Sequence, residues 1–268
     1  MRPAALALLV LLAVGPALAV ERQEPLPDEL EGVGVTEHLD ATVPLGASFK
    51  DENGHPVQLR EYFQEGTPVV LVLGYYRCPM LCGLVFNGVR DAVKESGLAP
   101  GADFRLVTLS IDPNETPSLA AAKKANYMES LDMPGADWHF LTGTEAEIRA
   151  VADALGFGYR WVAERNEYAH PAVLHVLTPE GRISRYLYGV QHEARTFRLS
   201  LVEASEGRIG TATDKILLYC FHYDPQSRAY AVAAARLAMR IGGALTVLAL
   251  GAVLAGFWVR EARRKRVA

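Results

Sequence analysis

Basic residues are not in excess in this chain: 27 lysines and arginines stand against 31 aspartates and glutamates, which gives a formal net charge of −4. No basic patch stands out in the middle of the sequence, so nucleic acid is not expected as a partner. The chain also has no internal repeat and no low-complexity segment. Cysteine is scarce, and because the count is three, the cysteines cannot all pair with one another. Half of the residues are apolar, which is enough for a full core in the middle section.

The first 44 residues divide into two parts. Residues 1–19 have Arg2 near the start, an apolar run of Ala, Leu and Val, and the ending Ala17-Leu18-Ala19. A basic start, an apolar centre and a small-x-small ending are typical of a secretory signal peptide, which we expect to be cleaved after Ala19. An uncleaved N-terminal anchor is the alternative. Residues 20–44, rich in Pro, Glu and Gly, are predicted to form an extended lead-in.

The other end of the chain has the pattern of a membrane anchor. Residues 241–259 carry no charge and are close to the ~20 residues that a bilayer-spanning helix needs. The basic residues in 260–268 then place this tail in the cytoplasm and residues 20–230 outside, by the positive-inside rule. We therefore expect a bacterial inner-membrane protein whose soluble domain faces the periplasmic or extracytoplasmic side, where cysteines form disulfides or bind metals. Residues 208–240 form the predicted juxtamembrane segment.

Strand and helix patterns alternate through residues 45–207. Asn53-Gly54 predicts the turn of a hairpin over residues 49–59, and Thr144 followed by Glu147 predicts a capping box. The order of elements predicts an α/β domain of the thioredoxin-like type, with a central mixed sheet flanked by helices, followed by the C-terminal transmembrane helix. Strands are predicted at 69–73, 104–111, 138–141, 159–162, 173–177 and 183–188, and helices at 81–94, 116–128, 144–155 and 195–204.

Two cysteines, Cys78 and Cys82, fall where the strand 69–73 ends and the next helix begins. A spacing of four residues predicts that both thiols lie on one helix face, one turn apart, where they could share a metal ion or form a disulfide. The positive end of a helix is expected to lower the pKa of such thiols and to favour the thiolate. The alternative is that the two cysteines are small core residues at helical spacing.

His170 is the first candidate for a third ligand. It stands in Tyr168-Ala169-His170-Pro171-Ala172, directly before the strand 173–177. In thioredoxin-like folds a proline at this connection is often cis and presses against the active cysteines, so His170-Pro171 would direct the imidazole toward them. Two soft thiolates and one imidazole suit copper in either oxidation state. A solvent-exposed loop histidine is the alternative.

The remaining candidates are weaker. Asp112, with Asn114 and Glu115, follows the second buried strand, where a carboxylate could orient a nearby catalytic or ligand group, although Asp-Pro is also an ordinary turn. Cys220 and His222 share a face if their segment is extended, so they are either a second copper-handling point or part of an aromatic interfacial anchor. His175 is expected in the core of its strand. The other histidines are expected to be structural or exposed, namely His38, His55, His139 and His192.

Four motifs of this chain belong together: the run from Leu73 to Cys82, the strand ending in Ser110-Ile111-Asp112-Pro113, the segment Leu141-Thr142-Gly143, and His170 eleven residues before Gly181. Taken together, they resemble the Sco/SenC family. The similarity covers roughly residues 45 to 205. It implies a thioredoxin-like copper chaperone that assembles the dinuclear copper centre of cytochrome c oxidase, so the partner would be an oxidase subunit with a copper site. It also implies that Cys78, Cys82 and His170 are the copper ligands.

Three features depart from the family pattern. Ala169 replaces an Asp that usually precedes the ligand histidine, and Pro171 replaces a Ser or Thr. Both changes shift some of the weight from copper delivery toward thiol-disulfide chemistry, because outer-shell partners tune metal affinity. The anchor lies at the C-terminus rather than the N-terminus, which resembles a bacterial side branch of the family.

Two functions follow from these observations. The first is a membrane-tethered copper chaperone that holds copper with two thiolates and one imidazole. The second is a periplasmic thiol-disulfide reductase in which Cys78 is the nucleophile and Cys82 the resolving thiol. The spacing of four argues mildly against the second, because oxidoreductase pairs are normally Cys-x-x-Cys.

Overall fold

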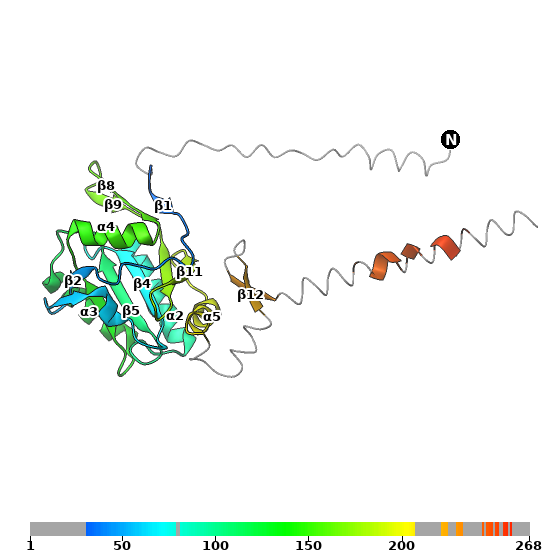
Figure 1. Cartoon of the computed structure of the whole chain (residues 1–268), viewed down its shortest axis with the longest axis horizontal. Helices are drawn as coiled ribbons and strands as arrows, with labels where there is room; N and C mark the ends of the chain where they lie inside the picture. Colours follow the sequence, from blue (N-terminus) through cyan, green and yellow to red (C-terminus); the bar gives the residue numbers. More distant parts are fainter. Residues whose placement is uncertain are drawn as a thin grey trace, which may run out of the picture. The chain divides into compact units, whose positions relative to one another are not determined.

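The computed structural model describes residues 31–78, 81–206, 221–224 and 229–232, together with scattered helical positions between 243 and 258 (Figure 1). The predicted signal peptide, the basic tail and most of the juxtamembrane segment lie outside the described residues. Within the described part of the chain, we find no helix that combines the length and the hydropathy needed to cross a bilayer. The chain divides into two compact units, Met1–Glu31 and Gly32–Ala268, and the fold below belongs to the second.

A five-stranded mixed sheet forms the centre of the fold (Figure 1). Strands β4, β5 and β6 run parallel, whereas β10 is antiparallel to both β4 and β11. β4 is buried at every position, which is why it has no polar alternation and reads as the apolar run Val-Val-Leu-Val-Leu-Gly. The strand order is β11-β10-β4-β5-β6, with bounds β4 Val69–Gly74, β5 Arg105–Ser110, β6 Trp138–Leu141, β10 Val173–Leu177 and β11 Ile183–Tyr188.

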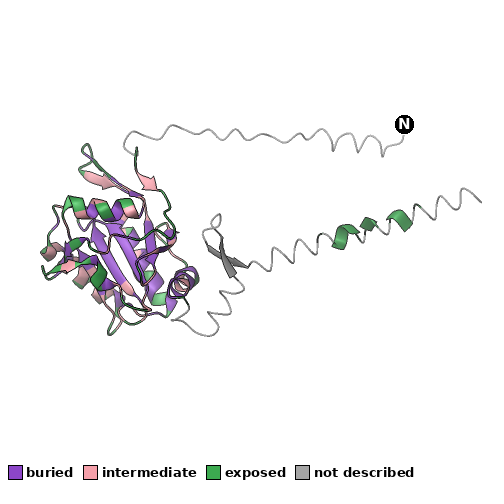
Figure 2. Ribbon diagram, viewed as in Figure 1, coloured by how far each residue is buried: buried purple, intermediate pink, exposed green. Residues whose placement is uncertain are grey.

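Four helices cover the sheet, and Figure 2 shows the buried strands between their half-exposed surfaces. α2 connects β4 to β5, and α3 connects β5 to β6. Both connections join parallel neighbouring strands in the same direction across the sheet, and such crossovers are right-handed, so the two helices lie on the same face. There Phe86 of α2 meets Tyr127 of α3 edge-on. The chain reverses direction after β6, which places α4 on the opposite face. The prediction of a mixed sheet flanked by helices is therefore confirmed. The helices are α2 Leu81–Ser96, α3 Pro117–Leu131, α4 Glu145–Ala154 and α5 Ala194–Ala204.

Smaller elements surround this domain. β2 (Ser48–Lys50) and β3 (Pro56–Gln58) form the predicted hairpin, and Gly54 has the positive φ of +83° that its turn requires. In the lead-in, β1 (Gly34–Val35) pairs with β7 (Phe157–Gly158). Two further hairpins and one short helix complete the described elements. The hairpins are β8 (Arg160–Val162) with β9 (Glu167–Ala169) and β12 (Phe221–Asp224) with β13 (Ala229–Val232), and the helix is η2 (Leu59–Tyr62).

The helix α4 does not begin with the predicted capping box. Thr144 is the N-cap residue, but its side chain makes no capping hydrogen bond. The carboxylate of Glu147 instead accepts a hydrogen bond from the backbone N–H of Ser48, at 3.3 Å. Glu147 thus bonds to Ser48 of the hairpin β2–β3 and not to the backbone of Thr144 at its own helix start.

Candidate metal centre

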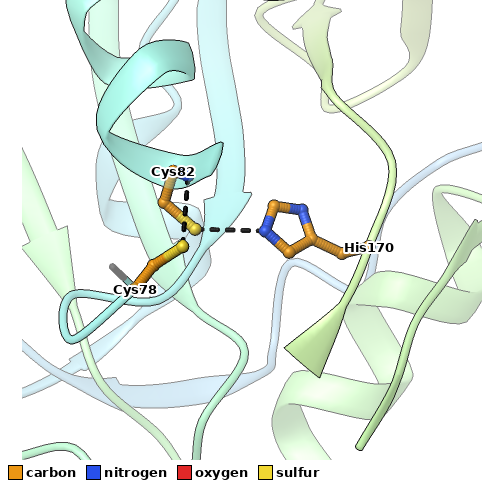
Figure 3. A group of neighbouring side chains, drawn as sticks. All are labelled: Cys78, Cys82 and His170. Carbon is orange, nitrogen blue, oxygen red and sulfur yellow. Dashed lines mark hydrogen bonds between the residues drawn. The ribbon is translucent and has the colours of Figure 1, made fainter. Parts of the chain in front are cut away.

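Three side chains from separate segments meet at the amino end of α2 (Figure 3). Cys78 lies in the loop after β4, Cys82 in the first turn of α2, and His170 between β9 and β10. One ligand atom from each lies within 4.8 Å of the other two, and Cys82 Sγ lies 3.1 Å from His170 Nε2. Among the described residues, these three form the one group of His, Cys and carboxylate side chains that could hold a metal ion. The structure thus brings together all three side chains selected from the sequence.

The two thiols do not meet in the predicted way. α2 begins at Leu81, so Cys78 lies in the loop before the helix and not one turn along its face. The backbone N–H of Cys82 donates to Cys78 Sγ at 3.3 Å (Figure 3). The contact therefore uses one of the N–H groups that every helix start leaves without an intrahelical partner.

The imidazole of His170 points at the cysteines as predicted, but the peptide bond after it differs from the expectation. No peptide bond among the described residues is cis, so the His170-Pro171 bond is trans. The ring is held instead by a hydrogen bond from Nδ1 to the carbonyl oxygen of Pro171, at 3.0 Å. A proton on Nδ1 leaves the Nε2 lone pair directed at the sulfur atoms, as a ligand histidine requires. His170 is only 7% exposed, which rules out the solvent-exposed alternative.

The electrostatics of the pair correct another expectation. A hydrogen bond with Cys78, followed by burial, raises the pKa of the Cys82 thiol far above its usual value, instead of the predicted lowering. A sulfur acceptor at hydrogen-bond distance and the loss of water outweigh the partial charge of the helix end. Cys82 is 1% exposed, whereas Cys78 is half-buried. Cys78 is therefore the thiol that an external molecule reaches first.

A buried carboxylate from the predicted group at residues 112–115 holds the loop before Cys78. Glu115, 5% exposed, accepts hydrogen bonds from the backbone N–H groups of Tyr76 at 2.8 Å and Arg77 at 2.7 Å, and from Ser110 Oγ at 2.6 Å. Burial raises the pKa of this carboxyl group. These three bonds fix the backbone directly ahead of the half-buried thiol.

Asp112 makes only an ordinary turn, because its Oδ1 accepts from the backbone N–H of Asn114 at 2.9 Å. Of the carboxylates predicted at this strand end, Glu115 therefore supports the loop before Cys78, whereas Asp112 does not.

The other histidines stay outside this centre. His175 is fully buried in β10, as predicted, and His139 contacts Asp137 with its Nε2 at 2.9 Å. His38 contacts the carbonyl of Ala154 through Nδ1, at 3.1 Å. Of the second predicted pair, Cys220 lies outside the described residues, and only the backbone of His222 is described, within β12.

A thioredoxin-like α/β domain with two cysteine thiols and an imidazole at the amino end of α2 defines a class of redox and metal-binding proteins. The family model of SCO1/SenC matches residues 40–200, which is more than half of the sequence, and the chain belongs to this family. No curated protein matches the sequence.

Several solved structures are similar to this chain. A candidate electron transfer protein from Aquifex aeolicus VF5 is 28% identical, with 62% of this chain and 94% of that chain covered and a TM-score of 0.55. BsSco, described as a member of the Sco family of cytochrome c oxidase assembly proteins, is 18% identical, with 64% and 98% covered and a TM-score of 0.50. Copper-bound ScoI from Arabidopsis thaliana is 21% identical, with 59% and 95% covered and a TM-score of 0.49.

Proposed function

We propose that this protein binds copper through Cys78, Cys82 and His170 and delivers it to the copper site of a cytochrome c oxidase subunit. The observation that carries the proposal is the convergence of two sulfurs and one imidazole nitrogen within 4.8 Å. Thiolates are soft ligands that select copper(I), and imidazole suits copper in both common oxidation states. Membership of the SCO1/SenC family supports the choice of copper over other soft metals.

The unequal exposure of the two thiols suggests how copper leaves. Cys82 and His170 are buried, whereas Cys78 is half-buried. A cysteine of the acceptor would first replace Cys78 on the metal, and the two inner ligands would then be exchanged in turn. Each replacement forms one copper–sulfur bond as another copper–ligand bond breaks, so copper is never without ligands.

The place of action and the partner belong to the same proposal. The signal-peptide pattern of residues 1–19, the apolar run at 241–259 and the basic residues after it support a tethered protein with its domain outside the cytoplasm. Such a tether would hold the thiols near membrane-bound oxidase subunits. The description of BsSco as a member of a family of cytochrome c oxidase assembly proteins supports an oxidase subunit as the acceptor.

A second candidate function is thiol-disulfide reduction of cysteines in the acceptor. It is favoured by the unequal thiols. The half-buried Cys78 can attack a disulfide, and Cys82, whose nitrogen lies 3.3 Å from Cys78 Sγ, is placed to resolve the mixed disulfide. The partner's disulfide gains two electrons and two protons and becomes two thiols, while Cys78 and Cys82 become a disulfide.

Anaerobic copper(I) titration of the full chain against a competing chelator tests the copper proposal. We expect one copper per chain, and a loss of affinity in Cys78→Ser, Cys82→Ser and His170→Ala that exceeds the roughly 10–100-fold typical of outer-shell substitutions. His55→Ala is the control, because that imidazole is exposed and lies in the hairpin β2–β3 turn. Wild-type affinity in His170→Ala would show that the ligand assignment is wrong. Rapid exchange with a model disulfide and no copper binding would favour the reductase.

A further inference from the structure

The imidazole of His170 packs against the ring of Phe157, a core residue of β7. The two ring centroids lie 6.0 Å apart, with an interplanar angle of 31°. Phe157 is 1% exposed and belongs to the hydrophobic core. The hydrogen bond from His170 Nδ1 reaches only the next residue, Pro171, so it moves with that segment, and the ring of Tyr75 comes from the loop before Cys78. Phe157 therefore ties the imidazole to a part of the fold outside the site.

The backbone of Phe157 is paired with the lead-in and not with the central sheet. β7 is two residues long, and among the described strands it pairs with β1, where Val35 lies opposite Phe157. The backbone N–H of Thr36 also donates to the carbonyl oxygen of Gly156, at 2.9 Å. The position of the Phe157 ring thus depends on a strand that lies more than 100 residues earlier in the sequence.

The lead-in is itself attached to the domain beyond β7. The backbone N–H of His38 donates to the hydroxyl oxygen of Tyr186 in β11 at 2.9 Å, and this hydroxyl donates to the carbonyl oxygen of Leu155 at 3.1 Å. The backbone N–H of Asp40 donates to the carbonyl oxygen of Ile183, at 2.9 Å. The segment from β1 to Asp40 therefore joins β7, the end of α4 and β11.

We propose that Phe157 is a positioning residue for His170 and that the lead-in strand β1 keeps it in place. While β1 is paired with β7, the Phe157 ring supports the imidazole, and Nε2 stays 3.1 Å from Cys82 Sγ (Figure 3). When β1 leaves β7, that support is lost and the imidazole can move away from the thiols. The effect on copper rests on the function proposed above, whereas the link from β1 to the His170 segment does not.

A glycine in β7 allows β1 to be displaced by one substitution. A Cβ on Gly158 would lie 2.2 Å from the carbonyl oxygen of Gly32, so Gly158→Ala pushes the lead-in away from β7. The φ of Gly158 is not positive, and alanine is therefore not strained by the backbone itself. Gly143→Ala is the matched control: its φ is not positive either, and its Cβ would lie 2.5 Å from the ring of Phe49 in the hairpin β2–β3.

Hydrogen exchange of the full, metal-free chain, measured by mass spectrometry, tests this link without copper. In Gly158→Ala we expect faster exchange at residues 33–38, because β1 has left β7. We also expect about tenfold faster exchange at residues 167–172, which contain β9 and His170. Gly143→Ala should match the parent at residues 167–172.

Phe157→Leu tests the ring itself. Leucine keeps an apolar side chain in the core but removes the ring that contacts His170. Exchange at residues 167–172 should again rise about tenfold, while residues 105–110 of β5, which report general loosening of the fold, should match the parent. Parent-like exchange at 167–172 in both variants, or an equal rise at 105–110, would overturn the inference.

Copper(I) affinity and X-ray absorption of the same proteins, in a Cys220→Ser background, test the effect on the metal. We expect Phe157→Leu and Gly158→Ala to lose about 10–100-fold in affinity and to show a weaker imidazole contribution with both sulfurs retained, whereas Gly143→Ala binds like the parent. Parent-like affinity and spectra in both variants would reject a positioning role toward copper. A parent that binds no copper, together with faster exchange at 167–172 in the variants, would reject the copper function and leave the link from β1 to His170 intact.

Discussion

The imidazole of His175 should make the stability of this domain depend on pH in a way that one substitution removes. His175 is fully buried in β10, between the rings of Phe157 and Tyr186, whose centroids lie 5.9 and 5.3 Å from its own. Its Nδ1 lies 3.2 Å from the carbonyl oxygen of Leu71, and its Nε2 has no hydrogen-bond partner among the described residues. A proton added to Nε2 would therefore create a buried charge without a partner.

Burial lowers the pKa of His175 from 6.5 to about 4. As the pH falls below 6.5, the unfolded chain takes up a proton at this residue and the folded chain does not, so the free energy of unfolding decreases. The decrease continues until the pH reaches about 4. The full effect is about 3 kcal/mol, and about 2 kcal/mol of it appears between roughly pH 7.5 and pH 5.

Urea denaturation of the metal-free protein at a series of pH values measures this effect. His175→Asn keeps a donor near the Nδ1 position and cannot take a charge. It is expected to lower stability at every pH through lost packing, but its stability should fall by about 2 kcal/mol less than that of wild type between roughly pH 7.5 and pH 5. His192, whose pKa burial also lowers to about 4, is present in both proteins and cancels in the comparison. Parallel pH profiles for the two proteins would refute the reasoning.

Three further predictions concern the centre and its support. Gly88→Ala should destabilise the fold by about 1–3 kcal/mol in urea denaturation, because a Cβ there would lie 2.0 Å from the carbonyl oxygen of Val190, and an unchanged midpoint would contradict this. Glu115→Gln places an amide group against the backbone N–H groups of Tyr76 and Arg77, so copper affinity should fall about 10–100-fold, whereas Asp112→Asn should have no effect. In the metal-free protein, iodoacetamide should modify Cys78 before Cys82, because burial and the bond with Cys78 keep Cys82 protonated, and peptide mapping that finds Cys82 modified first would reject this order.

Most of the sheet could be predicted from the sequence because its strands are apolar runs. Val69–Gly74 and Val173–Leu177 are buried at every position, and a run of that kind has few alternatives in a chain of this composition. β9 was not predicted: Glu167–Ala169 is short and half-buried throughout, so it has neither the length nor the alternation that indicates a strand. Its pairing with β8 depends on the tertiary position of the hairpin.

Distant partners explain what the sequence did not predict in the site. Cys78, Cys82 and His170 were identified because sulfur and imidazole are rare and chemically distinctive. A carboxylate among residues 112–115 was also expected to act there, but the partners of Glu115 could not be predicted, because they are backbone N–H groups of Tyr76 and Arg77, some 38 residues away, that carry no signal in the sequence. The pKa of Cys82 was predicted in the wrong direction for a similar reason. The prediction considered the helix end and could not include the position of the neighbouring sulfur.

X-ray absorption spectroscopy of the copper(I)-loaded full chain tests the central claim most directly. The account predicts two sulfur ligands and one imidazole nitrogen in wild type. In His170→Ala the imidazole contribution should disappear, while Cys220→Ser should leave the spectrum unchanged. A spectrum without imidazole in wild type, or one that His170→Ala does not alter, would contradict the assignment of Cys78, Cys82 and His170 as the copper site.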